Sequence, residues 1–114
     1  MLILTTKLKN AINKRISGME FYLSQITVNG NKRGTSGFIK NPENGLIIYV
    51  NTEGIKWDGK GRQYMYRYAD SVRDHSSLKY RNRWAYSLDE LAENIVNLLQ
   101  EPDPEMMKRI QKGA

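Results

Sequence analysis

With 114 residues, the chain fits one domain built around a single core. It has no cysteine, one histidine and no run near the roughly 20 apolar residues of a membrane span, which excludes disulfides, thiolate or histidine-rich metal centres and a transmembrane helix. The net charge of +6 is typical of a basic protein, and the apolar stretch in MLILTTKLKN is too short for a secretory signal, so we expect a cytoplasmic location.

The first predicted element is a helix over residues 6–17. Leu8, Ile12 and Ile16 fall on one face of it, while lysines and asparagines fall on the other. Gly18 follows, at a position where a residue in the left-handed conformation usually closes a helix.

Four strands are predicted next. EFYLSQITV is rich in aromatic and β-branched residues, FIK follows the predicted loop NGNKRGTSG, and LIIYV is apolar on both faces, as a central strand would be. In the fourth strand, QYMYRYA, three tyrosines alternate with Met65, Arg67 and Ala69. Either the tyrosines pack against a helix and Arg67 points outward, or the tyrosines form an exposed stacking platform; the first is the commoner arrangement.

The segment YSLDELAENIVNLL predicts a second helix. Ser87 and Glu90 have the S-x-x-E spacing of a capping box at its start, and Pro102 ends it. Asp103 can cap a short last helix over residues 103–112, with Pro104 at its first position.

Strands that follow one another through short loops favour an antiparallel meander. We therefore predict a single α+β domain over residues 1–114, in which a four-stranded antiparallel sheet carries the N-terminal helix and the C-terminal helices on one face. The last short helix would be peripheral, and the other face of the sheet would be open to water or to a partner.

The segment from Gln63 to Trp84 is dense in arginine and tyrosine, the side chains that contact phosphates and unstacked bases. Residues 1–86 also carry 15 Lys and Arg against 6 Asp and Glu, whereas residues 87–114 carry 3 against 6. A basic body of this kind favours an anionic partner. The candidate nucleic-acid-binding residues are Arg62, Arg67, Arg73, Lys79, Tyr80, Arg81, Arg83 and Trp84.

The pattern YMYRYADSVRDHSS, followed by the capped SLDELAENIVNLL, covers residues 64–99. It resembles small proteins of uncharacterised function from phages and other mobile elements of Gram-positive bacteria. The resemblance implies no catalytic residue and no cofactor. It does imply a protein that binds a host protein or a nucleic acid.

We therefore expect a small non-enzymatic binding protein that engages nucleic acid or a complex that handles nucleic acid. One alternative is a protein-binding module or inhibitor of a host protein, which would use the open sheet face or an edge strand. Another is a small metal-dependent nuclease based on Asp74 and His75. Because adjacent side chains usually point apart, a surface histidine without a catalytic role is the commoner outcome for His75.

Overall fold

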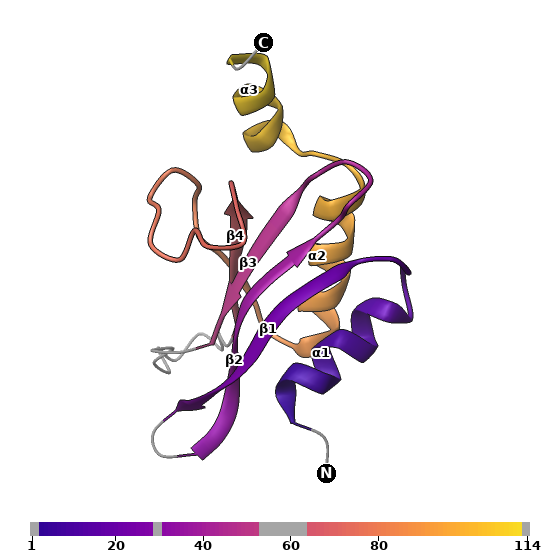
Figure 1. The fold of residues 1–114 in the computed structure, drawn as a ribbon, viewed down its shortest axis with the longest axis vertical. Helices are drawn as coiled ribbons and strands as arrows, with labels where there is room; N and C mark the ends of the chain where they lie inside the picture. The colour runs from indigo at the N-terminus through magenta and orange to yellow at the C-terminus, as the bar shows by residue number, and fades with distance from the viewer. Residues whose placement is uncertain (1–2, 29–30, 53–63, 113–114) are drawn as a thin grey trace.

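The computed structural model describes residues 3–28, 31–52 and 64–112. Within them, the strands form one antiparallel sheet in the order β1-β2-β3-β4-β5, with one helix before it in the chain and two after it (Figure 1). The α+β prediction is confirmed, with one strand more than predicted. The elements are α1 (Leu4–Asn13), β1 (Glu20–Val28), β2 (Asn31–Lys40), β3 (Ile47–Asn51), β4 (Tyr64–Ala69), β5 (Arg83–Ala85), α2 (Leu88–Gln100) and α3 (Pro104–Lys112).

The main core lies between the sheet and helices α1 and α2. Leu8 and Ile12 of α1 are fully buried, as is the α2 face that carries Leu91 and Ile95, because the apolar side chains of each helix recur every three or four residues. Figure 1 shows α2 behind the sheet and α3 at one end of the molecule. The central strand β3 is buried along nearly its whole length, as predicted.

The tyrosines of β4 face these helices. Tyr66 and Tyr68 are buried in the main core and Tyr64 packs against it. The Tyr68 hydroxyl donates to the carbonyl of Leu98 at 3.3 Å, so α2 satisfies the polar end of the ring. The prediction that these tyrosines pack against a helix is confirmed, and they form no exposed stacking platform.

The opposite face of the sheet is not open, contrary to expectation. Phe38, Ile47 and Tyr49 form a second buried cluster there with Ala69. His75, in the segment that follows β4, lies with its ring centroid 5.0 Å from that of Phe38 and 5.8 Å from that of Tyr49, in an edge-on orientation. The segment after β4 therefore folds back over the part of the sheet that was predicted to be exposed.

Arg67 lies beneath this segment and is only 2% exposed, so the expectation that it points into solvent is wrong. Its guanidinium donates to the carbonyl oxygens of Asp74 at 2.6 Å and Tyr68 at 3.0 Å. The Asp74 carboxylate lies 3.7 Å from the same guanidinium, which also sits 4.5 Å from the centroid of the Tyr49 ring. These partners offset the cost of burying a charge, which the sequence argument took to be unpaired.

Two further predictions about the strands are wrong. Most of NGNKRGTSG, predicted as a loop, belongs to β2, and its backbone pairs with β1 through Gln25↔Thr35 and Ile26↔Gly34. The four-strand prediction also missed the short strand β5, just before Tyr86, which pairs with β4. In both cases cross-strand hydrogen bonds outweigh a weak local strand preference.

The boundaries of α2 and α3 follow their capping signals closely, whereas those of α1 do not. The Ser87 hydroxyl accepts from the Glu90 backbone N–H at 3.1 Å, and the Glu90 carboxylate accepts from the Tyr86 N–H at 3.0 Å. The Asp103 carboxylate accepts from two backbone N–H groups of the first turn of α3. Helix α1 runs from Leu4 to Asn13 rather than over residues 6–17.

Candidate nucleic-acid interface

Arg83 of β5 connects the sheet to helix α3. One of its terminal nitrogens lies 2.6 Å from the Asp103 carboxylate and 2.8 Å from the Glu105 carboxylate. The guanidinium also lies over the Tyr68 ring at 5.2 Å. Burial alone would lower the pKa of Arg83, but hydrogen bonds to the two carboxylates outweigh it and raise the pKa above its ordinary value. Arg83 is therefore a structural cation with little contact with solvent.

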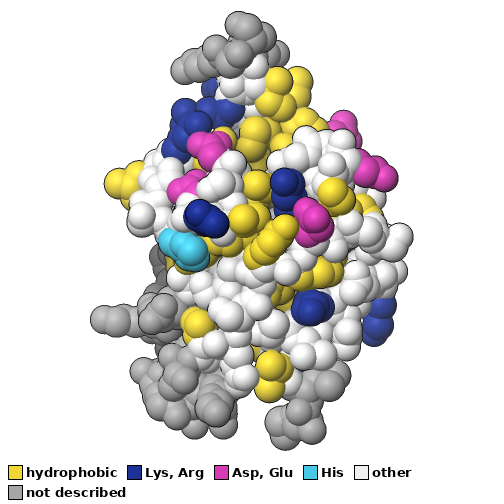
Figure 2. Space-filling view, viewed as in Figure 1, with side chains coloured by type: hydrophobic (Ala, Val, Ile, Leu, Met, Phe, Trp, Pro, Cys, Tyr) yellow, Lys and Arg dark blue, Asp and Glu magenta, His cyan; other side chains and the backbone are white. Residues whose placement is uncertain are grey.

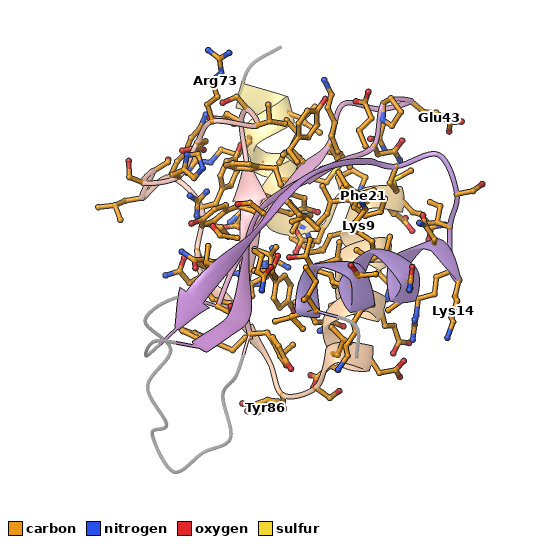
Figure 3. All side chains as sticks on the ribbon, turned by 60° about the horizontal axis from the view of Figure 1, so that its bottom comes forward. Lys9, Lys14, Phe21, Glu43, Arg73 and Tyr86 are labelled. Atoms are coloured by element: carbon orange, nitrogen blue, oxygen red, sulfur yellow. The ribbon has the colours of Figure 1, made fainter. Side chains whose placement is uncertain are left out.

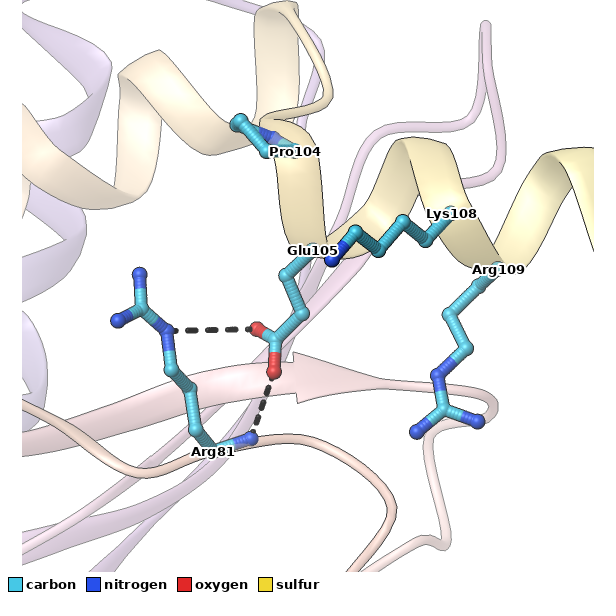
Figure 4. Close-up of a pocket in the computed structure, with 5 residues that line it drawn as sticks. All are labelled: Arg81, Pro104, Glu105, Lys108 and Arg109. Carbon is cyan, nitrogen blue, oxygen red and sulfur yellow. Dashed lines mark hydrogen bonds and ion pairs between the residues drawn. The ribbon is translucent and has the colours of Figure 1, made fainter.

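Glu105 is shared between Arg83 and the segment before β5. Its second carboxylate oxygen accepts from the Arg81 backbone N–H at 2.8 Å, and the Arg81 side chain approaches to 4.0 Å. Figure 4 shows Glu105 between Arg81 and Arg109, in a pocket of about 380 Å³ that Pro104 and Lys108 also line. Both Glu105 oxygens are occupied, and 70% of the Arg81 side chain remains exposed.

The segment between β4 and β5 is held at a second point by Asp70. The Asp70 carboxylate accepts from Lys79 Nζ at 2.7 Å and from the Tyr80 hydroxyl at 2.5 Å. Partial burial would raise the pKa of Asp70, but these two bonds and the Lys79 charge outweigh it and lower the pKa. Burial, followed by the bond to Asp70, raises the pKa of Tyr80. Tyr80 is thus a buried anchor.

Helix α3 braces the same segment from the other side. The Arg109 guanidinium donates to the Lys79 carbonyl and lies 5.3 Å from the centroid of the Tyr80 ring. Met106, one turn earlier in α3, is buried in the main core. Within the segment between β4 and β5, Lys79, Tyr80, Arg81 and Arg83 contact α3. We call residues 70–83 and α3 together the α3-end surface.

The structure divides the predicted binding residues into three groups. Arg67, Tyr80 and Arg83 are buried and hold the fold together, so a surface role does not fit them. Trp84 is half-buried on β5, and Arg62 lies outside the described residues. The exposed members are Arg73, Lys79 and Arg81, all on the α3-end surface.

Two exposed cations of this surface, Lys108 and Arg109, were missed by the sequence argument because it treated residues 87–114 as one acidic segment. A signal was present. Lys108 and Arg109 follow Glu105 by three and four residues, so on a helix all three side chains lie on neighbouring positions of one surface.

The acids and bases of the α3-end surface differ in their exposure. The side chains described there include six cations and three carboxylates. Asp103, just before α3, adds a fourth carboxylate, and Arg67 of β4 adds a seventh cation. The Asp74, Asp103 and Glu105 side chains are 15–20% exposed because they turn inward toward Arg67 and Arg83. The charges left at the surface are Asp70 and the cations Arg73, Lys79, Arg81, Lys108 and Arg109.

The figures agree with this distribution. Figure 2 shows one larger group of Lys and Arg side chains near the end where α3 lies, with single, separated cations elsewhere on the face in view. In Figure 3, Arg73 extends away from the body of the protein. The inward turn of the acids therefore leaves a cationic surface at this end of the molecule.

Asp74 and His75 do not converge on a common point. Asp74 faces Arg67, whereas His75 packs on Phe38 and Tyr49 and contacts the Arg73 carbonyl at 3.2 Å. In the described part of the chain, no group of three or more His, Asp or Glu side chains is arranged to hold a metal ion.

The same residues contain no helix that is both long enough and apolar enough to span a bilayer. In comparisons with known proteins, no family model, no curated protein and no solved structure matched the chain.

Proposed function

We propose that the protein is a small non-enzymatic module that binds nucleic acid, alone or within a complex that handles nucleic acid, through the phosphates. One observation carries the proposal: the Asp74, Asp103 and Glu105 carboxylates are turned inward, so that exposed cations outnumber exposed carboxylates on the α3-end surface, where Asp70 is the exposed carboxylate among the described residues. A phosphate backbone is a dense array of anions, and each contact releases condensed counterions. The mobile-element resemblance of residues 64–99 is compatible with this role.

The cations that support the proposal are Arg73, Lys79, Arg81, Lys108 and Arg109. Asp70 offsets part of the Lys79 charge, and the Glu105 carboxylate lies 4.0 Å from the Arg81 side chain, so we expect Arg73, Lys108 and Arg109 to be the stronger phosphate contacts. The buried rings of Tyr66, Tyr68 and Tyr80 cannot stack on bases in this fold. Binding led by phosphates depends strongly on salt and weakly on sequence.

The test is fluorescence anisotropy with labelled single- and double-stranded DNA and RNA of about 20 nucleotides, at salt concentrations of about 50 and 200 mM. The triple variant Arg73→Gln/Arg81→Gln/Lys108→Gln removes three surface cations. We expect it to weaken binding by at least about tenfold and to reduce the salt slope by about 2 to 3.

The matched control is Lys7→Gln/Lys9→Gln/Lys14→Gln, which removes the same charge from α1 at a different part of the surface. It should change affinity by less than about threefold, because only the long-range field is altered. Equal losses in the two triple variants, or wild-type binding that ignores salt, would contradict a phosphate-binding α3-end surface.

A protein-binding role is the second candidate, and strand β1 favours it. This nine-residue strand is the edge of the sheet, and Tyr22 on it is 47% exposed. An extended segment of a partner could add to such an edge. The expected result is a partner captured from bacterial lysate that survives nuclease treatment and is lost with Tyr22→Asp. If the partner is captured only when nucleic acid is present, the result supports nucleic-acid binding instead.

A further inference from the structure

Leu78 is 98% exposed, in the middle of the cationic segment between β4 and β5. Of the large apolar side chains in the described residues, the next most exposed are Tyr86 and Ile110, at 50% each. A leucine with almost no contact to its own protein has given up the burial that usually stabilises such a side chain. Its position therefore needs a cause in the surrounding structure.

The backbone next to Leu78 is held through the two residues that follow it, Lys79 and Tyr80. The Ser77 hydroxyl accepts from the Lys79 N–H at 3.1 Å, and Arg109 of α3 donates to the Lys79 carbonyl. The Lys79 side chain and the Tyr80 hydroxyl are both bound to Asp70. Moving Leu78 inward would disturb these bonds, so the segment presents the side chain outward in a fixed position.

A binding partner for this part of the surface must accept one isolated apolar side chain, Leu78, in a segment rich in cations. A protein hot spot is built mainly from tryptophan, tyrosine and arginine, with leucine under-represented. A lipid bilayer needs more apolar area than one leucine supplies. Duplex nucleic acid meets both conditions, because single leucine side chains enter between base pairs in proteins that kink DNA while cations hold the phosphates.

We propose that Leu78 is an apolar wedge that enters between two base pairs of a nucleic-acid duplex while Arg73, Lys79 and Arg81 contact the flanking phosphates. This inference rests on the proposed function and narrows its ligand to a duplex. Insertion unstacks one base step and kinks the duplex, so steps that unstack easily, such as TA and CA, should be favoured.

The experiment measures energy transfer between dyes at the two ends of a DNA duplex of about 20 base pairs, together with its affinity. Wild-type protein should increase the transfer. Leu78→Ala should abolish the increase and weaken duplex binding by about tenfold, with binding of a single strand unchanged. Leu78→Met should retain both effects because it keeps a long apolar side chain, and Ile110→Ala, the control at another exposed apolar residue, should also retain them.

The outcomes separate this inference from the proposed function. Equal bending by wild type and Leu78→Ala, or binding of single strands only, overturns the wedge and leaves the proposed function standing. No binding of any nucleic acid overturns both. Binding to vesicles of phosphatidylcholine and phosphatidylglycerol that is lost with Leu78→Ala, without duplex bending, assigns the leucine to a lipid contact and overturns the wedge.

Discussion

The Arg83 guanidinium of β5 lies 2.8 Å from the Glu105 carboxylate of α3, and this contact joins the last strand of the sheet to the last helix. The Asp103 carboxylate lies 2.6 Å from the same guanidinium nitrogen. The acidic C-terminal segment is thus a source of counter-charges for the largely buried Arg83.

Removing Glu105 should therefore destabilise the protein. Glu105→Ala leaves Arg83 with one carboxylate, and Arg83 Nε is already buried without an acceptor among the described residues. We expect the free energy of unfolding to fall by about 2 kcal/mol, because Asp103 retains part of the interaction. Urea unfolding measures this. Glu93→Ala, at an exposed position of α2, should change stability by less than about 0.5 kcal/mol; equal effects of the two substitutions would refute a special role for Glu105.

Two arginines close together in the chain should respond very differently to truncation. Arg67→Ala removes a buried guanidinium together with its hydrogen bonds to the Tyr68 and Asp74 carbonyls and its ion pair with the Asp74 carboxylate, so we expect a loss of about 3 kcal/mol. Arg73→Ala removes an exposed side chain and should cost less than about 0.5 kcal/mol. Thermal and urea unfolding of the two variants provide the comparison. Similar losses would mean that Arg67 is not buried as described.

Asp70 makes stability depend on pH at the acidic end. Its folded-state pKa is lowered below the ordinary value of 3.8, so the ionised form stabilises the fold at all pH values above that value. Asp70→Asn should cost about 1 kcal/mol at pH 7. The difference between wild type and variant should shrink as pH falls below 3.8 through the folded pKa, because wild-type Asp70 then becomes protonated.

Unfolding curves recorded from neutral to acidic pH test this sign. A difference that grows on acidification would contradict the assignment. Asp89→Asn is a useful control, because Asp89 is an exposed carboxylate paired with Arg15 and has no contact with Tyr80.

Gly37 should be the glycine least tolerant of substitution. Its φ angle is +143°, and a Cβ atom built there would lie 2.0 Å from the Tyr22 carbonyl oxygen on β1. Gly37→Ala should cost about 3 kcal/mol or more, because backbone would have to move in the middle of the β1–β2 pairing. Gly18 has a φ angle of +87°, but nothing lies within 4 Å of an added Cβ atom. Gly18→Ala should therefore lower the free energy of unfolding by only about 1 kcal/mol. Circular dichroism melts rank the two variants.

Several features follow from residues close together in the chain. The capping residues Ser87 and Asp103 and the first position Pro104 mark where α2 and α3 begin, because a cap depends on atoms within one helical turn. The alternation in β4 also indicated that the three tyrosines share one face and that Met65 and Arg67 share the other, since successive strand residues point to opposite faces; which face meets the helices was left open.

The candidate site was only partly accessible to this reasoning. Composition pointed to residues 63–84, and Arg73, Lys79 and Arg81 are exposed in that segment. Composition could not distinguish these exposed cations from Arg67 and Arg83. A charge pattern gives the number of cations, but it does not show which of them lie beside a carboxylate in the folded protein.

The sequence by itself determined the presence of the helices, the α+β class, and the cation-rich segment between β4 and β5, because helical periodicity, capping and charge density are properties of neighbouring residues. Only the tertiary structure decided that β2 extends through a glycine-rich stretch, that Arg67 is buried beneath Asp74, and that α3 supplies the partners of Arg83. In each case the deciding contact depends on the tertiary fold: a strand partner, or an acid placed beside a cation. A buried charge or a weak strand is stable only when such a partner is in place.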